Sequence, residues 1–373
     1  MDLIYYYPPG SGGPNAVAKG VLTCLLKREE ELPFEKIKLF VPIRDLEDMQ
    51  GQFGDIEILT FKELNRASKN CLIHIPVGPL IFPNSKFLLH LFAIFKRRKL
   101  ILQEHGDVRT EMQIKWKYEH RLNVFYIPTY ISYPLLLKSA SKLIVHSYWM
   151  SNLVRSKYGV KNNVVIPNAI DDFWFDESNK TNIELDGDPA FFYHGRLAPE
   201  KGVDLLIKGF AKAISKDSKA KLYISGDGPQ RKQLEKMCVE LGVQKRVIFL
   251  GYNDLGQLKS YLSSVNAAIY PSIYETFSLA ILEAFSSVNG PVYYSSFAGI
   301  HDFVIRDGYD LNVFDPTIDN LTKIIKDIIE GNYDTEIAKQ QKEFARRYTW
   351  DKIIDQYIRV YNNVLKNVKF VMH

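Results

Sequence analysis

The chain has 373 residues, more than the roughly 250–300 that one hydrophobic core usually serves, so two domains are expected. Its hydrophobic share of 46% and charged share of 24% are ordinary for a globular protein and exclude a disordered, collagen-like or coiled-coil chain. The net charge of +5 is only mildly basic, and no nucleic-acid partner is expected.

The three cysteines, Cys24, Cys71 and Cys238, stand far apart and form no C-x-x-C pair, which excludes a zinc site or a disulfide framework. Reduced thiols fit a reducing compartment. The first residues lack the basic region of a signal peptide. No apolar run reaches the ~18 residues of a membrane helix, the nearest being the proline-broken Leu122–Leu137. These features predict a soluble, cytoplasmic protein.

The first half of the chain alternates short β-branched or aromatic runs with amphipathic stretches, as is typical of parallel α/β sheets. The expected strands are Leu3–Tyr7, Lys36–Val41, Ile56–Thr60, Cys71–Val77, Leu100–His105 and Lys142–Ser147, with helices over Asn15–Leu26 and Ser85–Phe95. The alternation stops near Asn168, and the acidic, polar stretch Asp171–Pro189 is expected to be a linker.

The same alternation restarts after this linker and predicts a second sheet. The expected strands are Ala190–His194, Lys221–Ser225, Val247–Gly251, Ala267–Tyr270 and Val292–Ser295, with helices over Val203–Ile214, Gln230–Leu241, Leu255–Val265 and Leu279–Ser287. Helical spacing then continues over Thr335–Tyr348 and Asp351–Val368 without a further strand.

The predicted fold class is therefore α/β, with two doubly wound, Rossmann-like parallel-sheet domains facing each other across a cleft. Their expected bounds are 1–170 and 171–349, followed by a C-terminal helix at 350–373 that crosses back toward the first domain. Ligands of such sheets bind at the carboxyl ends of the strands, so the strand exits are the places to look for chemistry.

The most informative strand exit is Tyr274–Ala284, which runs straight into good helix formers. Four amides there are expected to form a free helix N-terminus, those of Thr276, Phe277, Ser278 and Leu279. Such a terminus suits a phosphate. Glu275 and Glu283 flank it, and because carboxylates repel an anion, they are expected to accept hydroxyls of a sugar and a ribose. An exposed helix with ordinary surface glutamates remains the alternative.

Two other strand exits in the second half carry glycines and cations. His194–Gly202 places Arg196 and Lys201 at the mouth of the sheet, where a planar fork and a mobile ammonium suit phosphate oxygens. Gly226 follows the next strand and would let a ligand or a neighbouring loop approach closely. Two surface cations and a plain turn are the simpler alternatives.

In the first half, Gly12 and Gly13 lie between the first strand and the first helix, the position of a phosphate-cradling loop. The run is not G-x-G-x-x-G, which disfavours an NAD site. His105 ends a later strand and should point into the cleft, although a lone histidine is more often structural. No acidic or histidine cluster has metal spacing, and Asp186–Asp188 imitates a metal-binding D-x-D only within the linker. No metal is expected.

These segments resemble the retaining GT-B glycosyltransferases of family four, a group with glycogen-synthase-like and sucrose-synthase-like members. The E-x7-E motif corresponds to Glu275–Glu283, and the G-R-L-x-x-E-K-G segment to Gly195–Gly202. Weaker matches follow in the family's order, at Ile166–Asp171, Gly226–Pro229, Pro291–Asp302 and Tyr348–Asp351. Thr276 and Ser278 depart from the family's E-G-F-G-L, and in the first half only the glycine loop, His105 and Ser147 match.

The resemblance implies transfer of a hexose from a nucleotide-diphosphate sugar to a hydroxyl acceptor, with retention and without a metal or other cofactor. The donor would be a UDP- or GDP-sugar. The acceptor would be a glycan, a lipid-linked hydroxyl or a small molecule, in the synthesis of a glycan, glycolipid or cell-surface polysaccharide. By the same resemblance, Arg196 and Lys201 hold phosphate oxygens, Glu275 and His105 contact the donor sugar, and Glu283 contacts ribose. A nucleotide-sugar epimerase of the same double fold and an idle nucleotide-sugar-binding module remain alternatives.

A peripheral contact with the inner face of the membrane is a separate hypothesis. The apolar Phe87–Phe95 is followed by the basic run Lys96–Lys99, with Trp116–Tyr118 and the uncharged aromatic stretch to Leu137 further on. Surfaces of this kind can lie at the headgroup boundary of anionic lipids. The alternative is that Phe87–Phe95 is a buried helix between two strands, since it is apolar nearly all round.

Overall fold

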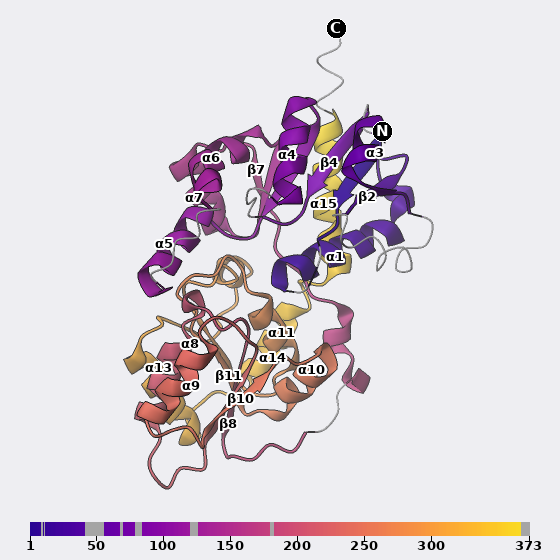
Figure 1. The fold of residues 1–373 in the computed structure, drawn as a ribbon. Helices are drawn as coiled ribbons and strands as arrows, with labels where there is room; N and C mark the ends of the chain where they lie inside the picture. The colour runs from indigo at the N-terminus through magenta and orange to yellow at the C-terminus, as the bar shows by residue number, and fades with distance from the viewer. Residues whose placement is uncertain are drawn as a thin grey trace. The chain divides into compact units, whose positions relative to one another are not determined.

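The computed structural model describes residues 1–8, 10, 12–41, 56–67, 70–78, 84–119, 126–179 and 183–366. The chain divides into two compact units, which Figure 1 draws as ribbons. Unit 1 comprises Met1–Ala169 and Trp350–His373, and unit 2 comprises Ile170–Thr349.

Unit 1 is built on a parallel sheet, and seven strands of it lie within the described ranges, in the order β3-β2-β1-β4-β5-β6-β7. The strands are β1 (Asp2–Tyr6), β2 (Ile37–Phe40), β3 (Ile58–Leu59), β4 (Cys71–Ile75), β5 (Lys99–Glu104), β6 (Lys142–Val145) and β7 (Asn163–Val165). The helices are α1 (Gly13–Lys27), α3 (Phe61–Ala67), α4 (Ser85–Phe95), α5 (Val108–Glu119), α6 (Tyr126–Ser139), α7 (Tyr148–Tyr158) and α15 (Trp350–Lys366). The strand order reverses between β1 and β4, which is where ligands of such sheets bind.

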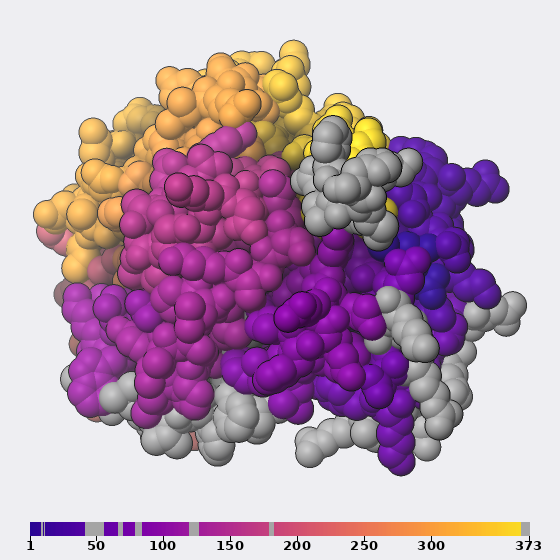
Figure 2. Space-filling view, turned by 90° about the horizontal axis from the view of Figure 1, so that it is seen from above, coloured from indigo at the N-terminus to yellow at the C-terminus, as the bar shows by residue number. Residues whose placement is uncertain are grey.

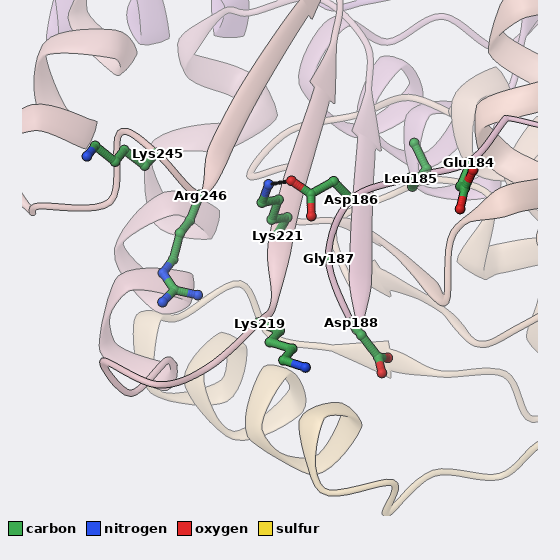
Figure 3. Close-up of a pocket in the computed structure, with 9 residues that line it drawn as sticks. All are labelled: Glu184, Leu185, Asp186, Gly187, Asp188, Lys219, Lys221, Lys245 and Arg246. Carbon is green, nitrogen blue, oxygen red and sulfur yellow. Dashed lines mark hydrogen bonds and ion pairs between the residues drawn. The ribbon is translucent and has the colours of Figure 1, made fainter.

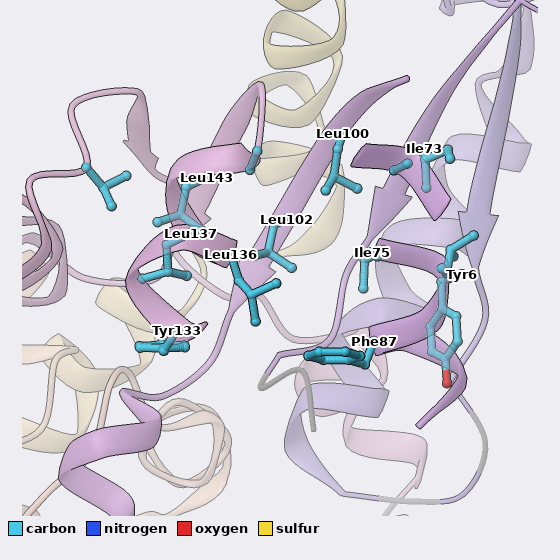
Figure 4. Packing of buried hydrophobic residues seen from close by; sticks show 14 of the residues in the cluster. Tyr6, Ile73, Ile75, Phe87, Leu100, Leu102, Tyr133, Leu136, Leu137 and Leu143 are labelled. Carbon is cyan, nitrogen blue, oxygen red and sulfur yellow. The ribbon is translucent and has the colours of Figure 1, made fainter. Parts of the chain in front are cut away.

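The core of unit 1 lies between this sheet and helices α4 and α6. Phe87 of α4 and Tyr133 and Leu137 of α6 pack over Ile75 and Leu102 of the central strands, as Figure 4 shows. All five residues of β4 are buried, as expected for a central strand covered on both faces.

Helix α15, the last described element, packs on α1 and so belongs to unit 1. Gly20 of α1 is needed for this contact, because a Cβ there would lie 2.3 Å from the indole of Trp350. Further along, the Tyr361 hydroxyl shares a hydrogen bond of 2.8 Å with Nδ1 of the buried His74 on β4. Residues far apart in sequence are therefore needed together to complete unit 1.

Unit 2 repeats the parallel arrangement with a sheet in the order β10-β9-β8-β11-β12-β13. The strands are β8 (Ala190–His194), β9 (Lys221–Ser225), β10 (Val247–Gly251), β11 (Ala267–Tyr270), β12 (Val292–Ser295) and β13 (Val313–Phe314). The helices are α8 (Val203–Ala213), α9 (Arg231–Glu240), α10 (Leu255–Ser264), α11 (Leu279–Ser287), α12 (His301–Arg306), α13 (Ile318–Ile329) and α14 (Ile337–Ala345). Two parallel α/β sheets confirm the predicted fold class.

The first residues of the expected linker Asp171–Pro189 are folded onto unit 2. Asp172–Phe175 forms a 3-10 helix, and its Trp174 is buried. The ammonium of Lys259, on α10, donates to the Phe173 carbonyl at 2.6 Å and so fixes this segment to unit 2. A single buried tryptophan in an acidic stretch creates no regular spacing of apolar residues, so the hydrophobic pattern of the sequence did not predict its burial.

Candidate functional site

Two loops at the carboxyl edge of the unit 2 sheet are joined through their backbones. Gly202, after β8, has φ +65°, and a Cβ there would lie 2.2 Å from the carbonyl oxygen of Pro271, after β11. The amide of Ile273 donates to the Glu200 carbonyl at 2.9 Å. A glycine is thus required at position 202, because no larger residue allows the two loops to come this close.

This junction brings Lys201 and Glu275 together, although 74 positions separate them. The Lys201 ammonium donates to a carboxylate oxygen of Glu275, and both side chains are mostly buried. A half-buried ion pair is held more firmly than a surface pair, because less water screens it. The arrangement places a cation and an anion next to each other at the strand exits. Each of them can bind a polar group of a ligand in place of the other.

Glu283 is held by a second interaction at the same edge. Nε2 of His194, the last residue of β8, lies 2.9 Å from a carboxylate oxygen of Glu283 on α11. The hydroxyl of Tyr270, the last residue of β11, lies 2.7 Å from Nδ1 of the same imidazole. His194 and Tyr270 were not singled out in the sequence, because a histidine and a tyrosine at strand ends most often serve packing.

Arg196 has a different environment. Its guanidinium donates to the carboxylate of Glu200, while more than half of the arginine side chain is exposed and Glu200 is nearly buried. An exposed ion pair between residues four positions apart contributes little free energy, so the guanidinium can be reoriented at low cost. Arg196 can therefore turn toward an anion at this edge of the sheet.

Helix α11 begins at Leu279, three residues after the start of the helix N-terminus expected over Thr276–Leu279. Thr276, Phe277 and Ser278 precede the helix, and Leu279 is its first residue, so only the last of the four expected amides is helical. The hydroxyl of Ser278 accepts a long bond of 3.4 Å from the Ile281 amide. The N-terminus is thus partly capped.

The backbone around Ser278 is strained. Ser278 has φ +92°, a region that glycine adopts easily and serine does not, at a cost of about 1–3 kcal/mol. The buried side chain of Phe277 and a hydrogen bond of 3.0 Å from the Ile300 amide to the Phe277 carbonyl hold the backbone in this strained conformation. The Gly299 amide likewise donates to the Glu275 carbonyl at 2.9 Å. The segment Ala298–Asp302 therefore holds the turn in place through its backbone.

Gly226 closes the same edge. Its φ is +128°, and a Cβ there would lie 2.0 Å from the carbonyl oxygen of Gly195. The position allows the loops after β8 and β9 to pack closely, which agrees with the expectation that this glycine lets a ligand or a neighbouring loop approach.

The first-half candidates lie in unit 1. Gly12 precedes α1 with φ +114° and is exposed, with no atom within 4 Å of a hypothetical Cβ. Gly13 is the first residue of α1, and both glycines stand at the carboxyl end of β1. This is open space at a helix start, where backbone can approach a ligand.

His105, directly after β5, is packed against a second histidine. Its ring lies 4.4 Å from that of His146, and its Nε2 donates to the Pro76 carbonyl at 2.9 Å. Burial and the neighbouring imidazole hold the pKa of His105 well below its usual value, so the ring is uncharged. Gln103 lies 3.2 Å from Nε2 of His146 and completes the network, which the sequence did not indicate.

The structure thus groups the predicted residues by unit. Those in unit 2 lie at the exits of β8, β9 and β11 and are Arg196, Lys201, Gly226, Glu275, Thr276, Phe277, Ser278, Leu279 and Glu283. Those in unit 1 lie at the exits of β1 and β5 and are Gly12, Gly13 and His105.

A hollow on unit 2 lies elsewhere. It measures about 900 Å³ and is lined by Glu184, Leu185, Asp186, Gly187, Asp188, Lys219, Lys221, Lys245 and Arg246. These residues lie at the amino ends of β8, β9 and β10, at the opposite edge of the sheet from the candidate site. Figure 3 shows the ion pair between Asp186 and Lys221 among them. In the described part of the chain, no three His, Cys, Asp or Glu side chains cluster as metal ligands would.

Residues 175–348 match the model of the family described as glycosyl transferases group 1. The glycosyltransferase MJ1607 of Methanocaldococcus jannaschii is 29% identical over 178 residues, which cover 47% of this chain and 45% of that protein. The glycosyltransferase YqgM of Bacillus subtilis is 29% identical over 236 residues, which cover 61% of this chain and 64% of that protein. The chain thus spans less than two thirds of the length of these relatives.

Among solved structures, HepE of Anabaena in complex with UDP and glucose superposes with a TM-score of 0.73 at 18% identity, covering 97% of this chain and 100% of that chain. This likeness shows the fold, which is the GT-B arrangement of two parallel α/β sheets. Residues 175–348, nearly all of unit 2, are thus similar to the group 1 glycosyl transferases, and the chain has the fold of the solved glycosyltransferase structure.

Proposed function

We propose that the protein is a retaining glycosyltransferase that moves a hexose from a UDP- or GDP-sugar to a hydroxyl acceptor. The observation that carries this proposal is the meeting of Lys201 with Glu275 at the carboxyl edge of β8 and β11. The same edge holds Glu283 by one oxygen and offers the exposed guanidinium of Arg196. Cations for a diphosphate and carboxylates for sugar hydroxyls are thus supplied by neighbouring strand exits.

The cations would act on the leaving group. When the bond between the sugar and the diphosphate breaks, negative charge grows on the phosphate oxygens, and Lys201 and Arg196 would stabilise it. Phosphate would replace Glu275 as the partner of Lys201. Glu275 would then be released to accept a hydroxyl of the donor sugar, so that one exchange positions both ends of the donor.

The uncharged state of His105 suits a place against the donor sugar. A neutral imidazole can hydrogen-bond to a hydroxyl without adding positive charge beside a sugar carbon that itself becomes positive. Because the protein's own cations would offset the diphosphate, no metal is needed in this scheme. EDTA is therefore expected to leave the rate unchanged, and rescue of a chelated enzyme by manganese would contradict it.

The proposal is tested by nucleotide binding and by nucleoside diphosphate release. Thermal shifts with UDP, GDP and ADP sugars identify the donor, since a ligand at ~100 times its dissociation constant adds about 2.7 kcal/mol to stability. Lys201→Ala should lower turnover by roughly 10²–10³. Lys208→Ala is the matched control, because Lys208 makes an ion pair with Asp204 on the adjacent helix α8. Full activity in a folded Lys201→Ala variant would contradict the proposal that Lys201 binds the diphosphate of the donor.

Retention is tested separately, by proton NMR of the first-formed product. The anomeric configuration of the donor should be kept, and an inverted product would contradict the proposed reaction. Conversion of the donor sugar without any acceptor would instead favour an epimerase.

We also propose a peripheral membrane contact, with a lipid-linked or cell-surface glycan acceptor, through an apolar face formed by α4 and α6. The helices lie side by side, since Nε2 of His90 on α4 is 2.7 Å from Oγ of Ser139 on α6. Figure 2 shows one face of the molecule in space-filling form, coloured by residue number, so that the part of the chain that contains α4 and α6 runs from purple to magenta. The buried side of α4 includes Phe87 and Leu89, so the helix is partly the core element that the alternative expected.

The outer side of these helices is apolar and lacks acidic residues. Ile131 and Leu135 of α6 are 69% and 72% exposed, one helical turn apart, and Phe95 at the end of α4 is 80% exposed. Neither helix contains Asp or Glu. Lys96 and Arg97, directly after α4, are exposed and would face anionic headgroups, whereas Lys99 donates to the Val364 carbonyl and is not part of this face.

Co-sedimentation with phosphatidylglycerol vesicles tests the contact. Binding should fall with salt and should be lost in an Ile131→Ser, Leu135→Ser double variant and weakened by Lys96→Gln with Arg97→Gln. The matched control is Lys323→Gln with Lys326→Gln on α13 of unit 2, which removes the same charge. Absence of binding to the vesicles at low salt would contradict the membrane contact and favour a soluble acceptor. Within the described ranges, no helix is long and apolar enough to span a bilayer.

A further inference from the structure

Three side chains at the carboxyl edge of unit 2 form a short chain of hydrogen bonds. The Tyr270 hydroxyl is 2.7 Å from Nδ1 of His194, and Nε2 of His194 is 2.9 Å from a carboxylate oxygen of Glu283. The three residues come from β11, β8 and α11 respectively. Tyr270 and His194 are buried, so little water competes for these bonds.

The positions of the protons follow from the partners. A carboxylate only accepts hydrogen bonds, so Nε2 of His194 carries the proton that it donates to Glu283. Burial, followed by the charge of Glu283, raises the pKa of Tyr270 well above its usual value, so its hydroxyl keeps its proton. The Tyr270 hydroxyl then donates to Nδ1. Tyr270 therefore fixes the imidazole in the tautomer that serves Glu283.

The chain of bonds holds Glu283 by one side only. One oxygen of the carboxylate is taken by His194, and the side chain keeps 17% of its surface exposed, against 6% for His194. A glutamate without such a partner samples many rotamers, and a ligand must pay the entropy of ordering it. With one oxygen fixed, the other is oriented in advance and can accept a hydroxyl.

We propose that His194, itself oriented by Tyr270, is a positioning residue that turns the second oxygen of Glu283 toward the ribose hydroxyls of the donor nucleotide, and so sets the preference for a nucleotide that carries them. This inference rests on the proposed function, since it takes Glu283 as the group that contacts ribose. It adds that the contact depends on two side chains that touch no ligand.

The experiment compares the dissociation constants of UDP and 3′-deoxy-UDP by calorimetry, or of GDP and 3′-deoxy-GDP if GDP binds instead. In the wild type, loss of one hydroxyl bonded to a carboxylate should weaken binding about 10- to 100-fold. In His194→Phe, this ratio should fall toward one, because UDP weakens while 3′-deoxy-UDP changes by less than about threefold. Glu283→Gln should reduce the ratio in the same way.

Two further variants separate positioning from a structural role. His194→Gln keeps an N–H donor near Glu283 and should recover part of the ratio, and Tyr270→Phe removes only the hydroxyl and should give an intermediate ratio. These variants also serve if His194→Phe does not fold. If His194 were only structural, both nucleotides would weaken equally and the ratio would stay at its wild-type value, which would overturn the inference. If neither UDP nor GDP binds the wild type, the proposed function itself fails.

Discussion

Unit 1 should lose stability steeply between pH 7 and pH 5, because it contains histidines that its fold keeps uncharged. Burial lowers the pKa of His74 to about 3 and the pKa values of His90 and His146 to about 4. All three side chains are fully buried. In the unfolded chain each imidazole has its ordinary pKa near 6.5 and takes up a proton as the pH falls. Lowering the pH therefore favours the unfolded state until the folded pKa is reached.

The magnitude follows from these pKa values. At pH 5 the unfolded imidazole is almost fully protonated and the folded one is not, so each histidine lowers the free energy of unfolding by about 2 kcal/mol relative to pH 7. Three such residues give about 5–6 kcal/mol, a large part of the ~5–15 kcal/mol that stabilises a typical domain. The effect grows as the pH falls through about 6.5, the pKa at which the unfolded chain binds these protons.

His90→Gln isolates one of these contributions. Nε2 of His90 donates to Oγ of Ser139, whose own proton goes to the Leu136 carbonyl, and glutamine keeps a donor at this site. The free energy of unfolding of wild type and variant is measured by urea denaturation at pH 7 and pH 5. The variant should gain about 2 kcal/mol on the wild type between the two values. Parallel curves would mean that His90 is protonated in the folded state, and would refute the reasoning.

Three other changes test the packing and charge described above. Burial raises the pKa of Glu104, whose carboxylate oxygens have no hydrogen-bond partner among the described residues. The wild type therefore loses stability as the pH rises above about 4.5, the ordinary pKa that Glu104 has in the unfolded chain. In the same assay, the stability of Glu104→Gln relative to the wild type should increase from pH 5 to pH 8. Gly202→Ala should cost about 1–3 kcal/mol in denaturant melts and weaken nucleotide binding, because the added Cβ collides with the Pro271 carbonyl and separates Lys201 from Glu275; unchanged binding would show that the loops tolerate separation. Gly20→Ala should cost a similar amount by displacing the Trp350 indole, and a wild-type melting temperature would argue against the tight contact between α1 and α15.

Much of the fold was predictable because its strands are short apolar runs between polar or glycine-rich turns. In unit 2, strands such as Ala190–His194 and helix Leu279–Ser287 have the predicted bounds. The edge strands β7 and β13 were missed, since runs of two or three residues carry no detectable period. The burial of Trp174 was missed as well, because its segment Asp172–Phe175 packs against α11, which is distant in sequence.

The candidate site was predictable in its residues and not in its pairings. Arg196, Lys201, Glu275 and Glu283 stand at strand exits, and the sequence places them there. The ion pair between Lys201 and Glu275 spans 74 positions and depends on the backbone contact at Gly202, so it could not be predicted. His194 directly precedes the segment Gly195–Gly202 that carried the resemblance, yet its role emerged only when Tyr270 and Glu283 were found on either side of its ring.

The β-bridge between Ile170 and Thr349 has a consequence for synthesis on the ribosome. Unit 2 begins and ends at these paired residues, so all of its chain is contiguous. Unit 1 is interrupted, and its last helix, α15, is made only after the whole of unit 2. At about 5–20 residues per second, the nascent first segment waits roughly 10–40 s for α15 to cover α1. Unit 2 can thus finish folding first, while His74 and the α15-facing side of α1 remain open to chaperones.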